Sequence, residues 1–356
     1  MTGVTVHFAT NRNEIFDANG NVVDFGPDAN TKSHVWLRYG AADMVKAGKT
    51  YRMAELRVED EQVYRVDVEE EDEQILGSTA VFDGLRTRLR TKPNTDLLLL
   101  LHGYGCTFQN ALSNAAELKN QWSVAGKPLE VAVFSWPSDG KLTPMLAYAS
   151  DRDDGRESAK AVSRALTKLV EYLRHLKKEE RCEQDLHLVA HSMGNYVLRH
   201  ALQALTPDIG GRRLPRILKN IFLMAADEDN DAFEDDKKLM RLPELAEAVH
   251  VYLARNDTAL SISDITKGNP DRLGWTGPRT LTNLPSKVTL VDCTDVAETG
   301  AIDGCHQYYR KRSEVIADIR QVLAGKKPEE ISGRKWIPST SCFRIASSTE
   351  RRHKKG

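Results

Sequence analysis

The chain lacks a strong net charge and any long apolar run. Its 356 residues include 50 Lys and Arg and 51 Asp and Glu, for a formal net charge of −1. A nearly neutral chain has no overall electrostatic reason to bind nucleic acid or an anionic membrane surface, so we expect neither partner. Apolar runs such as Leu97–Leu101 are as long as a strand and far shorter than the roughly twenty residues that span a bilayer. We therefore expect no membrane span.

Cysteine is scarce and irregularly spaced. An odd number of cysteines without a repeated spacing argues against both a disulfide framework and a zinc site. We expect no metal and no organic cofactor. The first eight residues show no basic segment followed by a long apolar one, so no signal peptide is expected and a cytoplasmic location is predicted. The five cysteines are Cys106, Cys182, Cys293, Cys305 and Cys342.

From residue 96 onward, continuous apolar segments of strand length alternate with amphipathic helical segments. This alternation is typical of a parallel sheet covered by helices on both faces. We predict an α/β fold with a mostly parallel central sheet, whose functional site lies beyond the carboxyl ends of its strands. The predicted strands are 97–101, 131–136, 186–190, 221–226, 249–254 and 288–292, and the clearest helices are 156–178 and 313–323.

The first 95 residues have a different texture and are predicted to add an antiparallel extension to the same domain. Strands are expected at 4–10, 35–40, 51–58 and 63–68, with a loop at 17–32 because Asn, Gly, Asp and Pro are frequent there. Residues 96–325 form the predicted catalytic core. Residues 326–356 are basic and polar, and a flexible tail is expected. Three segments lie above the predicted site and are candidates for a cap: 139–155, 228–247 and 261–286.

The stretch 185–197 organises the predicted core. A buried strand turns sharply into an amphipathic helix, with Ser192 at the turn and small residues two positions away on either side. This is the context of a nucleophile elbow, in which the serine Oγ projects from the carboxyl end of the sheet. Ala190 stands where glycine is standard. The backbone N–H of Met193, at the start of the helix, is expected to point toward a developing oxyanion.

A serine nucleophile needs an imidazole base and an acid that orients the base. Enzymes built on this elbow place them in the order serine, acid, histidine. Ser192, Asp257 and His306 have that order, and each of the two later residues follows a predicted strand. Asp257 is the favoured acid, although it could instead cap a turn or a helix. The alternative acids are Asp227 and Asp229, which follow an earlier strand, and the more remote Asp295.

A second oxyanion donor is expected from the loop after the strand 97–101. The backbone N–H of Tyr104, or that of Gly103, could meet the N–H of Met193 there. Other side chains near the site are candidates for support or for the substrate pocket, although ordinary packing explains them equally well. They are His102, His191, Ser138, Tyr148 and Leu142.

At this point the chain resembles a bacterial family of α/β hydrolases of unknown function. The resemblance covers roughly residues 4–325 and implies the α/β-hydrolase fold with a Ser192–Asp257–His306 triad. It implies no substrate. The motifs that carry it are Phe8–Arg12, His102–Tyr104, Phe134–Ser138, Ala190–Asn195 and the His-x-Tyr-Tyr string His306–Tyr309.

These observations predict a serine hydrolase that acts on small-molecule carboxylic esters or thioesters through an acyl-enzyme intermediate. Two alternatives stay open. An acyltransferase would use the same triad with an alcohol or amine in place of water. A non-catalytic binding or scaffold protein could use the same fold, because fold does not dictate function. The sequence carries no signal for an oligomeric state.

Overall fold

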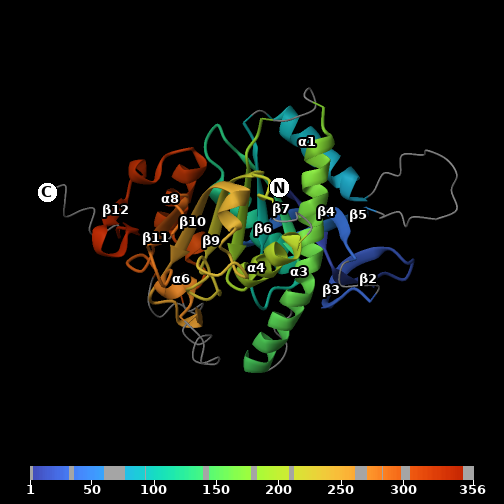
Figure 1. Ribbon diagram of the computed structural model, residues 1–356. Helices are drawn as coiled ribbons and strands as arrows, with labels where there is room; N and C mark the ends of the chain where they lie inside the picture. The colour runs from blue at the N-terminus through green and yellow to red at the C-terminus, as the bar shows by residue number, and fades with distance from the viewer. Residues whose placement is uncertain are drawn as a thin grey trace.

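The computed structural model describes residues 3–31, 36–59, 77–92, 94–138, 144–177, 183–207, 212–260, 271–282, 284–297 and 305–347. Within these residues, eleven strands form one sheet in the order β12-β13-β11-β10-β9-β8-β6-β7-β1-β4-β5 (Figure 1). No helix in the described part of the chain is long and apolar enough to cross a membrane.

The middle of the sheet is parallel, as the sequence predicts. Each neighbouring pair from β1 through β13 in this order is parallel, and the register is regular throughout. The carboxyl ends of these strands therefore meet at one edge, where the predicted site residues lie. The strands are β1 (Gly3–Thr10), β7 (Leu129–Ser135), β6 (Asp96–Leu101), β8 (Leu186–His191), β9 (Leu218–Met224), β10 (Ala246–Leu253), β11 (Val288–Asp292) and β13 (Cys342–Ile345).

The N-terminal part of the sheet is antiparallel, also as predicted. β4 (Arg38–Ala47) pairs with β1, and β5 (Thr50–Glu59) pairs with β4. β4 lies mostly beyond the strand expected at 35–40, and the strand expected at 63–68 lies outside the described residues.

The loop predicted at 17–32 is wrong in its second half. β2 (Arg12–Phe16) and β3 (Val22–Ala29) form a separate two-stranded hairpin. Phe25 anchors it, with its ring 5.7 Å from Phe8 and 4.8 Å from Phe108, centroid to centroid. This long-range aromatic packing offsets the weak strand propensity of a segment rich in Asp, Asn and Gly.

Helices cover both faces of the sheet, as predicted. α1 (Gly77–Thr91), α3 (Pro144–His175) and α4 (Gly194–Leu205) pack together on one face. α2 (Phe108–Trp122), α7 (Tyr308–Lys311) and α8 (Ser313–Leu323) pack together on the other. Alternate leucines of β6 face opposite layers, so Leu98 and Leu100 contact the core cluster that holds α2, whereas Leu101 contacts that of α3 and α4.

α3 begins twelve residues earlier than the predicted helix 156–178. From Pro144 onward, the candidate cap segment 139–155 is therefore the first part of this helix. In Figure 1 this part of α3 extends past the sheet edge that carries the candidate site. Segment 228–247 contains turns and the 3₁₀ helix η3 (Leu242–Leu245), and the described part of 261–286 includes α6 (Leu273–Thr276). A cap role for these segments stays a prediction.

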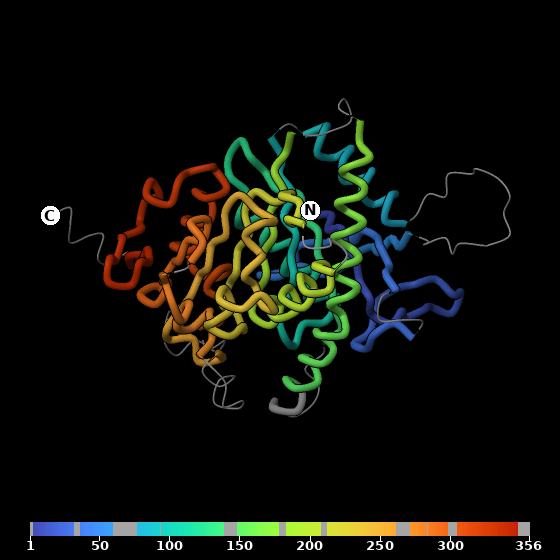
Figure 2. Tube along the Cα trace, viewed as in Figure 1, coloured from blue at the N-terminus to red at the C-terminus, as the bar shows by residue number. Residues whose placement is uncertain are grey.

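The C-terminal segment is folded up to residue 347, so the expected flexible tail is wrong over 326–347. β12 (Arg334–Ile337) and β13 extend the sheet beyond β11, and in Figure 2 they lie at the opposite end from the N-terminal strands. The buried Arg334 pairs with Asp318 of α8, with Nε–Oδ2 and Nη2–Oδ1 distances of 2.7 and 2.8 Å. Ile331 and Ile345 of this segment are also buried, in the core cluster that holds residues of α8. Residues 348–356 lie outside the described part of the chain.

Candidate active site

Ser192 occupies a strained turn between β8 and α4. Its φ of +54° lies in the left-handed region, which side chains other than glycine rarely adopt. Hydrogen bonds on both sides hold this conformation. The Ser192 N–H donates to the Met224 carbonyl at 2.9 Å. The Asn195 amide donates to the carbonyls of Ala190 at 3.1 Å and Ser192 at 3.0 Å. The geometry is that of the predicted elbow.

Two glycines let other backbone segments approach this turn closely. A Cβ on Gly194 would lie 2.5 Å from the Leu101 carbonyl oxygen, so only glycine allows α4 to start against the end of β6. A Cβ on Gly103 would lie 2.9 Å from the Ser192 Cβ and 3.0 Å from the His191 carbonyl oxygen. The loop that carries Gly103 and Tyr104 therefore lies directly against Ser192.

His306 and Asp257 are joined by a hydrogen bond between Nδ1 and Oδ2 of 2.7 Å. Asp257 is completely buried, and its Oδ1 accepts the N–H groups of Ala259 at 3.1 Å and Leu260 at 3.2 Å. One carboxylate oxygen of this aspartate therefore caps a turn while the other binds the histidine. A carboxylate oxygen can only accept a hydrogen bond, so Nδ1 of His306 carries the proton in this bond. Nε2 therefore bears the lone pair at which the neutral ring accepts a proton.

His191 supports the loop that carries His306. Its Nε2 lies 3.1 Å from the His306 carbonyl oxygen, which can only accept, so this nitrogen carries the proton. Its ring is 4.8 Å from that of His306 and 4.7 Å from that of Tyr309. Burial, followed by the nearby His306, lowers the pKa of His191 well below its usual value. A neutral His191 therefore holds the loop without placing a positive charge beside His306.

The alternative acid Asp227 is engaged elsewhere. Its Oδ2 accepts a hydrogen bond from the Tyr148 hydroxyl, and its Oδ1 lies 3.4 Å from Nε of Arg272. Its backbone N–H donates to the Ser192 carbonyl at 3.2 Å. Asp227 therefore lies beside the turn that carries Ser192, but the structure brings His306 to Asp257. The two remaining alternatives pair with basic side chains, Asp229 with Lys238 and Arg272, and Asp295 with Arg344.

Sequence reasoning assigned no role to Arg12, which fixes the loop after β6. This fully buried arginine donates from Nη2 to the Cys106 carbonyl at 2.6 Å and from Nε to the Ser135 hydroxyl at 2.9 Å. Asp151 of α3 holds the same loop by accepting the Gly105 N–H at 3.1 Å and the Ser138 hydroxyl. Arg12 belongs to the stretch Phe8–Arg12 that carried the family resemblance, but nothing in the spacing of Arg12 or Asp151 indicates these distant partners.

The remaining pocket candidates have different places. Ser138 and His102 are both buried and contact nearby backbone groups, Ser138 at the Cys106 N–H and His102 at the Gly103 carbonyl. The His102 ring stacks on Trp136, with centroids 5.1 Å apart, and burial lowers its pKa to about 3. Tyr148 is half-buried, and its ring lies 5.9 Å from that of Tyr104, so these two tyrosines lie together beside the site. Leu142 lies outside the described residues.

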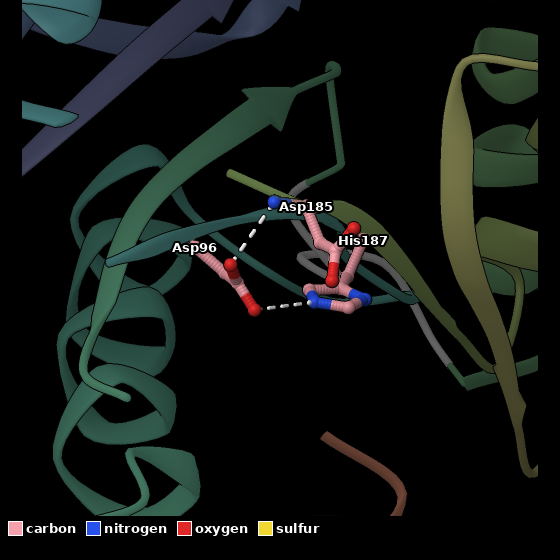
Figure 3. A group of neighbouring side chains, drawn as sticks. All are labelled: Asp96, Asp185 and His187. Carbon is pink, nitrogen blue, oxygen red and sulfur yellow. Dashed lines mark hydrogen bonds and ion pairs between the residues drawn. The ribbon is translucent and has the colours of Figure 1, made fainter. Parts of the chain in front are cut away.

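One group in the described part of the chain has the composition of a metal site. Asp96, Asp185 and His187 each offer a ligand atom, and these atoms lie within 4.8 Å of one another (Figure 3). The ammonium of Lys127 already lies 2.8 Å from Asp96 Oδ2 and 3.2 Å from Asp185 Oδ2. A lysine thus supplies the positive charge, and the group is better explained as an ion-pair cluster. It lies at the starts of β6 and β8, away from Ser192.

The comparisons with known proteins agree with this architecture. The family model described as an alpha/beta hydrolase of unknown function matches residues 78–326, so the chain belongs to that family. The fold is therefore the α/β-hydrolase fold, and the protein is an α/β hydrolase.

Individual relatives are distant. The chain is 25% identical over 220 residues to the uncharacterized protein alr1448 of Nostoc, across 48% of this chain and 54% of the relative, so it spans about half of that protein's length. An acetyl xylan esterase structure is 14% identical, with a TM-score of 0.36, over 65% of this chain and 97% of the other. A lipase-esterase related protein from Clostridium acetobutylicum is 16% identical, with a TM-score of 0.21, over 41% and 47% of the two chains.

Proposed function

We propose that the protein is a serine hydrolase that cleaves carboxylic esters or thioesters of small molecules. The observation that carries this proposal is the buried Asp257 bonded to Nδ1 of His306, together with Ser192 at the strained turn. These are the three groups that a serine nucleophile requires.

In this mechanism the Ser192 Oγ attacks the carbonyl carbon while Nε2 of His306 accepts its proton. The carbonyl oxygen becomes an oxyanion, which accepts hydrogen bonds from the backbone N–H groups of Met193 and of Tyr104 or Gly103. The tetrahedral intermediate then collapses and the bond to the alcohol or thiol breaks. The leaving group takes the proton from His306, and Ser192 holds the acyl group.

Water completes the cycle by the same steps. His306 takes a proton from water as its oxygen attacks the acyl carbon, then returns a proton to the Ser192 Oγ as the acid departs. Asp257 stays ionised and keeps the His306 ring in the tautomer and orientation that both steps need. An acyltransferase would differ only in the second nucleophile, which would be an alcohol or amine instead of water. If an added alcohol receives the acyl group in place of water, the protein is an acyltransferase.

We also propose a cytoplasmic location.

Hydrolysis of p-nitrophenyl esters of increasing chain length tests this proposal. We expect turnover by the wild type and its loss in Ser192→Ala, with an unchanged melting temperature. Turnover that persists undiminished in folded Ser192→Ala would eliminate the mechanism.

A further inference from the structure

A polar pocket of about 370 Å³ adjoins the candidate active site. Most of its lining comes from the end of β6 with the loop up to residue 106, from one side of α2, and from residues 307–310. The start of β5, at Thr50 and Tyr51, and His191 complete it. Its volume is many times the roughly 30 Å³ that one water molecule occupies in the liquid, so a substantial chemical group fits there. None of the residues that line it belongs to the proposed triad.

The pocket borders the reacting groups from two directions. Gly103 and His191 both line it, and both lie against Ser192, since a Cβ on Gly103 would be 2.9 Å from the Ser192 Cβ. Gln307, the residue after His306, lines it from the other side. A group in this pocket is therefore held by the loop of the oxyanion donors and by the loop of the base.

The lining is polar but carries no uncompensated charge. The cation Arg310 pairs with the anion Glu117 at 2.7 Å, and its Nε also donates to the Gln307 side chain at 2.7 Å. Charged ligands would have to compete with this pair.

Several hydrogen-bonding groups of the lining are not used within the described part of the chain. Asn114 has a single contact, from its amide nitrogen to the Cys106 sulfur at 3.9 Å, so its oxygen can accept. The Gln307 amide nitrogen can donate, and the side chain of Asn110 can do both. Together they offer donors and acceptors at separate points, which suits a ligand with several hydroxyl groups.

We propose that this pocket binds the alcohol portion of the ester, and that this alcohol is uncharged and carries several hydroxyl groups, as a sugar or a polyol does. The inference rests on the proposed function. The leaving oxygen takes its proton from His306 Nε2, so the alcohol departs on the His306 side, where Gln307 lines the pocket.

Two esters with the same acyl group and alcohols of similar size test the proposal. One is a 6-O-acyl methyl glucoside, and the other is an ester of cyclohexylmethanol. Both carry the acyl chain whose p-nitrophenyl ester the protein hydrolyses with the highest kcat/KM. We expect the wild type to favour the glucoside ester in kcat/KM. Asn114→Leu should reduce the ratio of the two kcat/KM values about tenfold, because leucine offers no hydrogen-bonding partner to the hydroxyl that Asn114 binds.

Gln109→Leu is the matched control, because Gln109 lies on α2 outside the pocket and bonds to Asp24. It should leave the ratio at the wild-type value. Equal kcat/KM for the two esters in the wild type, or an equal loss on both in Asn114→Leu, would overturn the inference.

A binding measurement separates this inference from the proposed function. Saturation-transfer NMR should detect methyl glucoside bound to Ser192→Ala, and binding should weaken when Asn114→Leu is added. If the wild type hydrolyses no ester but Ser192→Ala binds methyl glucoside, only the proposed function fails. If Ser192→Ala binds no methyl glucoside and the wild type shows no preference between the two esters, the assignment of the pocket is refuted.

Discussion

At the residue scale, the candidate site depends on one short loop and one strained turn. His306 is oriented by Asp257 at Nδ1 and by His191 at its backbone carbonyl. Cys305, the residue before His306, has a φ of +67°. This loop and the turn at Ser192 therefore each hold a non-glycine residue in the left-handed region. Such strain persists only where surrounding contacts enforce it. The arrangement of Ser192 and His306 therefore depends on a few individual contacts. The loss of each contact can be tested by a substitution that removes it.

Asparagine substitutions separate the two candidate acids. Asp257→Asn presents an amide donor to His306 and favours the wrong tautomer, so kcat should fall by about 10³- to 10⁴-fold, as when a triad aspartate is replaced. Asp227→Asn keeps an oxygen for the Tyr148 hydroxyl and should reduce kcat by less than about tenfold, the loss expected for one weakened hydrogen bond. Ester hydrolysis by both variants checks this, and the opposite ranking would make Asp227 the acid.

Gly103→Ala tests the close approach at Ser192. The new Cβ would lie 2.9 Å from the Ser192 Cβ and 3.0 Å from a backbone oxygen, so the loop must move away from the nucleophile. We expect kcat to fall about 100-fold, the loss typical of a missing oxyanion donor. Gly84→Ala in α1 is the control, because nothing lies within 4 Å of its Cβ position. Wild-type kcat in Gly103→Ala would show that this loop provides no oxyanion donor.

The elbow and the order of the three residues can be read from the sequence, since a strand, a serine turn and a helix are local features. The sequence alone does not decide whether Asp227 or Asp257 is the acid, because each aspartate follows a strand at the same sheet edge. What distinguishes them is the position of His306, a contact across 49 residues. The role of Arg12 was missed for the same reason, as its partner Cys106 is 94 residues away.

At the element scale, the parallel strands from β6 to β11 were predictable because they are largely buried and their sequences read as apolar runs. The hairpin of β2 and β3 was missed because it depends on the packing of Phe25 against distant rings. β12 and β13 were missed because each has only four residues and their register comes from β11 and α8.

Arg334→Met tests whether the C-terminal segment is part of the folded domain. The substitution leaves Asp318 buried with Tyr252 as its remaining partner, and removing one member of a buried ion pair costs about 3–5 kcal/mol of unfolding free energy. Urea unfolding provides the measurement. Lys335→Met, on an exposed position of the same strand, should change stability by less than about 0.5 kcal/mol. Equal, small effects of the two substitutions would mean that this segment contributes little to the fold.

At the scale of the whole molecule, the sheet encloses several buried histidines. A polar chain crosses three strands, from His187 Nδ1 to Asn220 at 3.1 Å and from Asn220 to His250 Nε2 at 3.0 Å. Burial lowers the pKa of His250 to about 3, and burial together with Arg88 lowers that of His7 to about 4. Protonation of His250 and His7 is therefore disfavoured in the folded state.

This burial predicts how stability depends on pH. Below the unfolded-state pKa of about 6.5, the unfolded chain binds protons that the folded chain excludes, so the free energy of unfolding falls as pH falls toward 4. Each such histidine adds a slope approaching about 1.4 kcal/mol per pH unit. Urea titrations between pH 6 and 4.5 should show a slope smaller by about this amount in His7→Gln. An unchanged slope in that variant would mean that His7 is protonated in the folded protein.

The most direct test of the account is covalent labelling by a fluorophosphonate, which reacts with an activated serine. Wild type, Ser192→Ala and His306→Ala would be labelled under identical conditions, and the modified peptide identified by mass spectrometry. The account predicts a single adduct on Ser192 in the wild type and none in either variant. An adduct on another residue, or no adduct on folded wild-type protein, would contradict it.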